Sequence, residues 1–259
     1  MTLPPRSWRY PRVLAHRGGG TLAPENTLAG LREGMRRGFA AIEYDIMLAR
    51  DGVPVVMHDP YLGRTVAGSG NVFDYDAAEL SSMDAGAWFA REYEGEPVPL
   101  FVEFAGFCKA HGIWMNMELK PAPGFDVETG GTVARIAAAM YADEIAAGDM
   151  AAVPLLSSFS HLALEAAHQV APQVPRACLM SELPPDWERR AHSVEAVAIH
   201  TTHRHLTPEL AGKVRAAGFG LFCYTVNDPR RARELLSWGV DAFCTDRIDL
   251  IGPYFAAGV

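Results

Sequence analysis

The sequence predicts an α/β protein, a TIM (β/α)8 barrel, with residues 1–259 forming a single catalytic domain. Its length of 259 residues is close to the roughly 250 that one such barrel usually needs. Apolar runs alternate with amphipathic stretches along the whole chain, as they do in repeated βα units around a parallel sheet. Counting one barrel strand per unit gives about eight strands, the number that closes the barrel.

The first unit is the clearest. Residues 13–15 are apolar and lead into His16. Asn26 or Thr27 is a suitable cap for a helix that runs to about Arg37, with apolar residues at helical spacing, and Gly38 is a stop signal. A strand followed by a capped helix is therefore expected at the start of the fold.

The remaining elements follow the same alternation. Apolar runs predict strands at 41–48, 53–57, 113–119, 154–158, 177–180, 196–199, 220–226 and 240–245. Helical patterns separate the later strands, most plainly at 207–217 and 229–238.

The βα period is broken once, by a small insertion after the second strand region at about residues 59–99. This segment holds glycines and aromatic residues without a clear βα pattern. Because it follows His58 directly, it should lie over the C-terminal mouth of the barrel, where active sites of this fold are built. We expect it to act as a lid or a wall of the substrate site.

Bulk properties exclude several classes of function. The 23 Lys and Arg residues against 31 Asp and Glu give a net charge of -8, which repels nucleic acid. Residues 1–12 contain no apolar core of a secretory signal, and no apolar run is long enough to span a bilayer. The four cysteines lack CxxC spacing, as expected of buried free thiols in the cytoplasm. The oligomeric state cannot be predicted.

Three acidic residues stand near the ends of predicted strands. Strand side chains alternate between faces, so Glu43 and Asp45 point the same way, as do Glu118 and Lys120. Carboxylates inside a barrel are costly unless a cation or hydrogen bonds compensate them. Three of them form a hard oxygen site, so Glu43, Asp45 and Glu118 are predicted ligands of one divalent cation, Mg²⁺ or Ca²⁺.

Basic residues beside these carboxylates point to an anionic ligand. Arg17 precedes a turn of three glycines, where backbone amides can approach an anion, and Lys120 ends its strand. Both are expected to contact phosphate. Glu25 belongs to the substrate site or holds Arg17 by a charged hydrogen bond, and it also suits the start of a helix.

Two histidines are predicted at the same rim. His16 and His58 each end an apolar run. Phosphodiester cleavage needs one group to take a proton and another to give one, and imidazoles titrating near pH 6.5 can do both. His16 and His58 are therefore the predicted acid/base pair.

Later strand ends offer substrate contacts. Ser158, Phe159, Tyr224 and Asn227 could supply hydrogen bonds and an aromatic wall at the mouth, together with the pair at 245–246. The histidines at 200, 203 and 205 do not have settled zinc geometry, and a polar loop after a strand explains them better. Of these three, His200 is the one most expected to touch substrate.

The ordered set of motifs resembles the glycerophosphodiester phosphodiesterase family, and is most similar to its short bacterial cytoplasmic members. The motifs are HRGG at 16–19, PENT at 24–27, EYD at 43–45, HD at 58–59, ELKP at 118–121, SF at 158–159, YTVN at 224–227 and TD at 245–246. Many relatives carry Trp where this chain has Tyr224, and residues 100–103 match imperfectly. Both departures concern substrate fit.

This resemblance implies a TIM barrel that hydrolyses deacylated phospholipids, such as glycerophosphocholine or glycerophosphoethanolamine, to sn-glycerol 3-phosphate and an alcohol. It assigns the roles given above to the two histidines, the three carboxylates and the two basic residues. The family's proposed route goes through a cyclic phosphate. Neither that route nor direct water attack, nor the preferred alcohol, nor Mg²⁺ over Ca²⁺, follows from the residues.

Two other functions stay open. One is a lyase, related to phospholipase D toxins or phospholipases C, that stops at a cyclic phosphate. The other is a non-catalytic phosphate-binding barrel, which is disfavoured because no acid/base or ligand position is missing.

Overall fold

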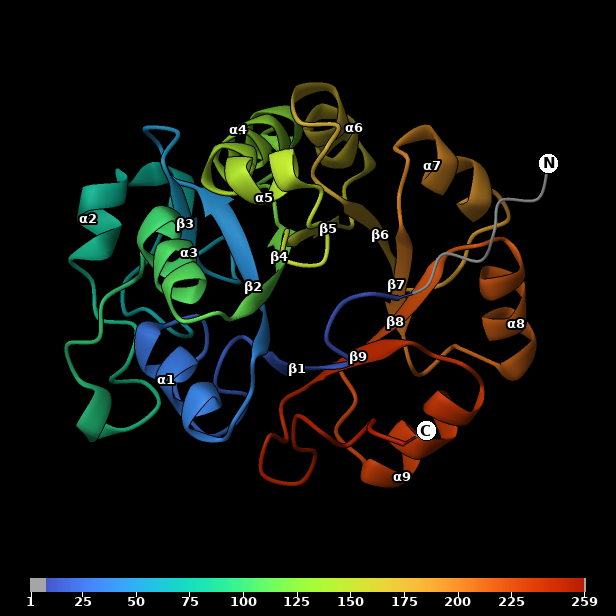
Figure 1. The fold of residues 1–259 in the computed structure, drawn as a ribbon. Coiled ribbons are helices and arrows are strands. Elements are labelled where there is room, and N and C mark those ends of the chain that lie inside the picture. The colour runs from blue at the N-terminus through green and yellow to red at the C-terminus, as the bar shows by residue number, and fades with distance from the viewer. Residues whose placement is uncertain (1–7, 259) are drawn as a thin grey trace.

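The computed structural model describes residues 8–258, and its sheet closes into the predicted barrel (Figure 1). Neighbouring barrel strands are parallel throughout, and β1 pairs with both β2 and β9, which closes the ring. The eight barrel strands are β1 (Val13–His16), β2 (Ala41–Leu48), β4 (Trp114–Leu119), β5 (Leu155–Ser158), β6 (Arg176–Met180), β7 (Ala198–Thr202), β8 (Gly220–Tyr224) and β9 (Ala242–Thr245).

One further strand lies outside the ring. β3 (Pro54–Val56) falls within the run predicted at 53–57, but it pairs with β2 in the antiparallel direction. It therefore turns the chain back along the end of β2 and delivers His58 to the same end of the barrel as His16.

Helices surround the strands, as expected of βα units (Figure 1). The first begins after Thr27, whose side chain accepts a hydrogen bond from the amide of Gly30, so Thr27 and not Asn26 is the cap. The helices around the barrel are α1 (Leu28–Arg36), α3 (Phe101–Ala110), α4 (Asp126–Met140), α5 (Ala142–Ala147), α6 (His161–Val170), α7 (Trp187–Ser193), α8 (Pro208–Ala216) and α9 (Pro229–Ser237).

Apolar side chains form separate layers outside and inside the strands. Ile42, Tyr44 and Ile46 on β2 belong to the layer under the helices, where the rings of Tyr44 and Phe104 lie 4.7 Å apart. The interior layer includes Leu14 and Phe222. Alternate residues of β2 therefore point into the barrel, which is how Glu43 and Asp45 reach its interior.

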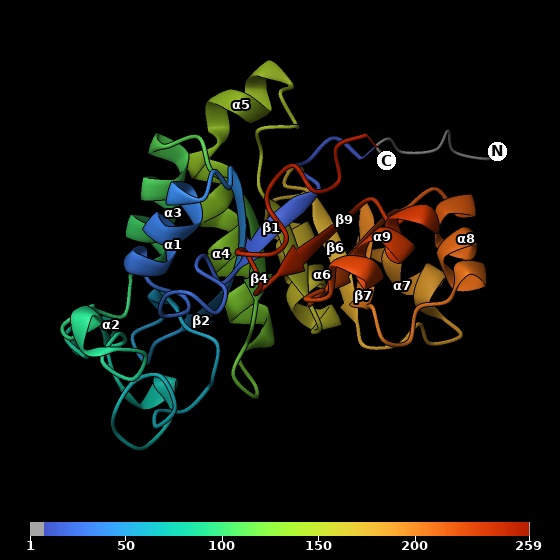
Figure 2. The same cartoon turned by 90° about the horizontal axis from the view of Figure 1, so that it is seen from below.

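The segment at 59–99 has its own small core. Buried Leu62, Val72 and Leu80 pack with Val55 and Met57. Its short helices are η1 (Val72–Asp74), α2 (Ala77–Ser81) and η2 (Arg91–Tyr93). Both views show the segment beside α1 and α3, to one side of the barrel (Figures 1 and 2). Its treatment as part of a single domain stays a prediction.

One strand boundary changes the interpretation of a residue. β7 was expected to end at 199, but it continues to Thr202 because its pairing with β6 and β8 continues through Thr201. His200 therefore lies within a strand and is fully buried, and the expectation of a polar loop at this position was wrong.

The four cysteines are buried and free, as predicted. Within residues 8–258, none of the helices combines the length and apolar character needed to cross a bilayer. The prediction that residues 1–12 hold no secretory signal concerns a segment whose first part, residues 1–7, lies outside the described residues.

Candidate active site

A pocket opens at the C-terminal ends of the barrel strands, with a volume of about 170 Å³. It is lined from nearly all sides of the ring, by His16, Arg17, Glu43, His58, Asn116, Glu118, Lys120, Phe159, Leu179, His200, Phe222, Tyr224, Thr225 and Cys244. Most of the site residues predicted from the sequence therefore face one space.

Three carboxylates cluster beside this pocket, and two of them, Glu43 and Glu118, line it. One oxygen from each of Glu43, Asp45 and Glu118 lies within 4.8 Å of the other two. Strand pairing brings them together, because Asp45 on β2 is directly opposite Glu118 on β4. Asn26 fixes Asp45 further, since its Nδ2 donates to Asp45 Oδ2 over 2.9 Å.

The electrostatics of this cluster leave negative charge without full compensation. Burial, followed by the charge of Asp45, raises the pKa of Glu43 and of Glu118 well above the usual range of a carboxyl. Burial also opposes ionisation of Asp45, but Lys120 and Arg17 outweigh it and lower the pKa of Asp45. Glu118 Oε1 is buried without a hydrogen-bond partner. An oxygen-rich, under-compensated anionic cluster fits a hard divalent cation.

Two basic side chains border the carboxylates. Lys120 Nζ lies 3.5 Å from Asp45 Oδ1 and 3.9 Å from Glu118 Oε1. Arg17 Nε lies 3.5 Å from Asp45 Oδ2 and makes no hydrogen bond there, while its NH1 donates to Glu25 Oε1 over 2.8 Å. Both cations line the pocket and can also meet an anion in it.

The glycine turn after Arg17 serves close packing. A Cβ on Gly20, whose φ is 55°, would lie 2.2 Å from the carbonyl oxygen of Asp246. A Cβ on Gly34 of α1 would lie 2.4 Å from the carbonyl oxygen of Gly18. The turn is thus pressed between α1 and the last strand, which fixes the position of Arg17.

His16 is held by an aspartate from the far end of the chain. Its Nδ1 lies 2.5 Å from Asp246 Oδ1, and Asn227 Nδ2 donates to Asp246 Oδ2 over 2.8 Å. Burial alone would raise the pKa of Asp246, but the hydrogen bond and charge of His16 lower it. Because an ionised carboxylate only accepts, Nδ1 of His16 carries the proton and Nε2 is directed to Glu43, 3.5 Å away.

His58 has an equivalent partner beside it in sequence. Its Nδ1 lies 2.6 Å from Asp59 Oδ1. Burial lowers the pKa of His58, and this effect exceeds the opposing influence of Asp45. His16 and His58 therefore each have one nitrogen fixed by a carboxylate and the other available for proton transfer.

The sequence profile of the glycerophosphoryl diester phosphodiesterase family matches residues 16–250, from the first of these histidines to beyond the last strand. The chain belongs to this family. A phosphodiesterase from Oleispira antarctica, whose structure was solved with the product sn-glycerol-3-phosphate, is 33% identical, with a TM-score of 0.81 over 91% of this chain and 93% of that one. The glycerophosphodiester phosphodiesterase of Caldanaerobacter subterraneus subsp. tengcongensis is 29% identical over 90% of this chain and 93% of its own.

A third similarity concerns a solved structure described as a putative glycerophosphoryl diester phosphodiesterase, from Silicibacter pomeroyi. It is 26% identical, with a TM-score of 0.74 over 92% of this chain and 90% of that one. The family assignment agrees with the resemblance found in the motifs and with the barrel, and it makes the chain an enzyme of the phosphodiesterase class.

Two aromatic rings that the sequence predicted at the mouth lie together at the pocket, and their role as a substrate wall stays a prediction. The rings of Phe159 and Tyr224 lie 5.9 Å apart in an edge-to-face arrangement, and both line the pocket. Phe159 is 53% exposed, so much of its ring faces the open mouth.

Three other predicted substrate contacts do not line the pocket. Ser158 Oγ donates to the carbonyl of Leu119 and accepts from the amide of Ser160. The side-chain amide of Asn227 donates to Asp246 Oδ2 and accepts from the hydroxyl of Thr245. Glu25 accepts a hydrogen bond from Arg17 NH1, which was one of its two predicted roles. In the described structure, these side chains therefore bond to neighbouring protein groups and do not line the pocket.

Sequence reasoning gave no role to Asn116 or Asp59, whereas His200, the histidine expected to touch substrate, lines the pocket. Asn116 lies two positions before Glu118, so the same alternation that identified Glu118 would have placed it inside the barrel. Its Oδ1 and both ring nitrogens of His200 are buried without hydrogen-bond partners in the described structure. Asp59 follows His58, yet nothing in a His-Asp pair alone shows that the two side chains meet.

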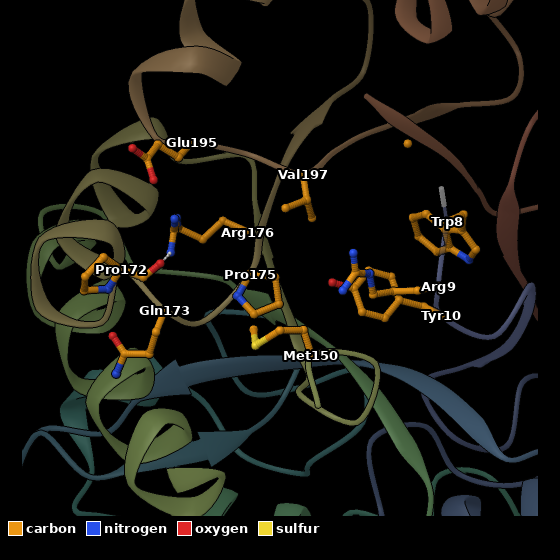
Figure 3. A pocket seen from close by; sticks show the side chains of 11 residues that line it. Trp8, Arg9, Tyr10, Met150, Pro172, Gln173, Pro175, Arg176, Glu195 and Val197 are labelled. Atoms are coloured by element: carbon orange, nitrogen blue, oxygen red, sulfur yellow. Dashed lines mark hydrogen bonds between the residues drawn. The ribbon is translucent and has the colours of Figure 1, made fainter. Parts of the chain in front are cut away.

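A larger cavity, of about 350 Å³, lies at the N-terminal end of the barrel strands, where Arg176 begins β6 and Gly220 begins β8 (Figure 3). Trp8 and Tyr10 stand across it from Arg176 (Figure 3). The Arg176 guanidinium donates to the carbonyls of Val194, Ala171, Pro172 and Val174. These bonds cap the loops on either side, and the cavity holds none of the residues discussed above for catalysis.

Proposed function

We propose that this protein hydrolyses glycerophosphodiesters, deacylated phospholipids such as glycerophosphocholine or glycerophosphoethanolamine, to sn-glycerol 3-phosphate and an alcohol. The observation that carries the proposal is one pocket lined by two cationic side chains, two oriented histidines and two carboxylates, with the third carboxylate, Asp45, clustered behind them. Family membership and the product bound to the Oleispira antarctica relative support it.

Glu43, Asp45 and Glu118 would hold one divalent cation, Mg²⁺ or Ca²⁺. The fit rests on the raised pKa values of Glu43 and Glu118, which a bound cation would offset, and on the Glu118 oxygen that has no hydrogen-bond partner among the described residues. When bound, the cation would supply positive charge that stabilises negative charge developing on the phosphoryl oxygens.

Arg17 and Lys120 attract and orient the phosphate. Each lies next to Asp45, which holds the charged group of the basic side chain at the pocket wall. N–H groups of both side chains stay available to donate to a phosphate. Their positive charge favours the more highly charged transition state over the diester itself.

His16 and His58 exchange protons with the reacting oxygens. One Nε2 removes a proton from the attacking hydroxyl, either of water or of the substrate's own glycerol, as its oxygen bonds to phosphorus. If the glycerol hydroxyl attacks, a cyclic phosphate forms first, and water then opens it to glycerol 3-phosphate with the two proton transfers repeated in reverse roles. The other histidine, protonated on both ring nitrogens, gives its Nε2 proton to the departing alkoxide as the P–O bond breaks, so the alcohol leaves neutral. Asp246 and Asp59 hold Nδ1 of the two rings, so Nε2 is the nitrogen of each ring that exchanges the proton.

Phosphorus NMR on glycerophosphocholine, after chelation and re-addition of Mg²⁺ or Ca²⁺, tests reaction and cation together. Glycerol 3-phosphate should accumulate only with a divalent cation present. Accumulation of a cyclic phosphate alone would make the protein a lyase. Phosphate binding without any turnover would make it a binding barrel.

A further inference from the structure

We infer that Arg64, contributed by the inserted segment at 59–99, is a positioning residue that holds the acid/base histidine His58 and the phosphate-binding Arg17 in one geometry. The inference rests on the proposed function for the roles of these two residues. It gives the insertion a defined task at a pocket that none of its described residues lines.

The first contact runs toward His58. Arg64 Nε donates to Asp59 Oδ2 over 2.5 Å, while Asp59 Oδ1 accepts from His58 Nδ1 over 2.6 Å. One carboxylate thus bridges the guanidinium and the imidazole. With Arg64 in place, Asp59 has a fixed direction in which to accept the hydrogen bond from His58 Nδ1.

The second contact runs toward Arg17. NH1 and NH2 of Arg64 donate to Oε2 and Oε1 of Glu25, over 2.8 and 2.7 Å. Glu25 Oε1 also accepts from Arg17 NH1 over 2.8 Å. Glu25 is therefore shared by two guanidinium groups, and Arg64 holds it in a planar, bidentate pair.

Burial makes these links significant. The side chains of Glu25 and Asp59 are only 13% and 12% exposed, so neither can exchange its partner easily for water. Burial opposes the ionisation of Asp59, but the hydrogen bonds from Arg64 and His58 lower the pKa of Asp59 to about 2. Without Arg64, both carboxylates would lose charge compensation and be free to turn.

The geometry also explains why an arginine is needed. Its three nitrogens serve two carboxylates that come from different parts of the chain, one before α1 and one after β3. A lysine has a single charged nitrogen and cannot make both a bidentate pair and a third bond in a fixed direction.

Arg50 provides a matched control. Its side chain is 52% exposed, compared with 43% for Arg64. It also makes three contacts, to Asp76 Oδ1, Glu79 Oε2 and the carbonyl of Asp74, on the part of the insertion that holds α2. Since Arg50 does not contact the pocket residues, R50A removes a similar surface ion-pair group without touching the site.

The experiment compares R64A, R64K and R50A with the wild type. R64A should lower kcat by about tenfold to a hundredfold, as loss of an orienting partner does, and should raise KM for glycerophosphocholine. R64K should recover little, and millimolar guanidinium should partly restore R64A, whose missing group is accessible to solvent. R50A should keep kcat and KM within about twofold of the wild type, since an exposed ion-pair group contributes little.

Two further variants distinguish the contact of Arg64 toward His58 from its contact toward Arg17. Asp59→Asn should mainly lower kcat, because it loosens His58. Glu25→Gln should mainly raise KM, because it loosens Arg17.

A direct readout does not depend on activity. Nitrogen-15 NMR of the histidine rings should show His58 protonated at Nδ1 in the wild type and in R50A, and a mixture of tautomers in R64A. If R64A keeps the His58 ring signals and turnover of the wild type, or loses no more than R50A, Arg64 has no positioning role. If the wild type itself does not cleave glycerophosphocholine, the proposed function fails, whereas the ring signals still decide the role of Arg64.

Discussion

His16 Nδ1 at the end of the first barrel strand and Asp246 Oδ1, one residue beyond the last, lie 2.5 Å apart although 230 positions separate them in the chain. β1 and β9 are paired neighbours, with Ala15 opposite Thr245. The orientation of a proposed acid/base group therefore depends on barrel closure.

Asp246→Asn should lower kcat by about tenfold or more, because an amide does not stabilise the charged imidazolium as a carboxylate does. Steady-state kinetics on glycerophosphocholine measures the change. Asp249→Asn is the control, since Asp249 pairs with Arg247 at the surface. Equal kcat in both variants would contradict the role assigned to Asp246.

Replacement of either histidine should remove one of two proton transfers. His16→Ala and His58→Ala should each reduce turnover by about a hundredfold or more, since general acid/base catalysis supplies roughly that factor. Cation affinity, measured by calorimetry, should stay near that of the wild type. Full activity in either variant would refute its proton-transfer role.

Lys120→Gln should separate phosphate binding from cation binding. Loss of a charge-assisted hydrogen bond of about 1.5–3 kcal/mol should weaken the affinity for glycerol 3-phosphate by about tenfold or more. Cation affinity should not fall, because the carboxylates lose a competing positive charge. Titration calorimetry with each ligand distinguishes the two effects, and a parallel loss of both would count against the assignment.

The cation should stabilise the fold most at alkaline pH. Burial raises the pKa of Glu118 from 4.5 to about 8, so the metal-free fold takes up a proton. The stability linked to this proton is full below 4.5 and is lost as the pH rises through about 8. The Tm gain on adding Mg²⁺ or Ca²⁺ should therefore be larger at about pH 8.5 than at about pH 6. A larger gain at the lower pH would contradict it.

Arg176→Met should affect stability and not catalysis. The substitution keeps the apolar stem but leaves buried carbonyls without donors, which costs about 3 kcal/mol. Thermal unfolding should show a lower Tm, while kcat on glycerophosphocholine at a permissive temperature should match the wild type. A selective fall in kcat would indicate that the cavity in Figure 3 communicates with the active site.

Much of the site could be predicted because the relevant residues share local rules. The alternation of strand side chains placed Glu43, Asp45 and Glu118 inside the barrel, and their strand-end positions placed them at one rim. Ser158 and Asn227 met the same positional rule, but their polar atoms are used by neighbouring protein groups. A position at a strand end does not show which partner a side chain finds.

The sequence by itself determined the barrel, the acidic cluster and the two histidines, because periodicity and strand ends are properties of consecutive residues. The tertiary structure decided how these groups are held. It joins His16 to Asp246 and Arg64 to both Glu25 and Asp59, and it encloses His200 within β7. Such contacts depend on strand order, closure and packing, which set the distance between residues far apart in the chain and are not recorded in any local pattern.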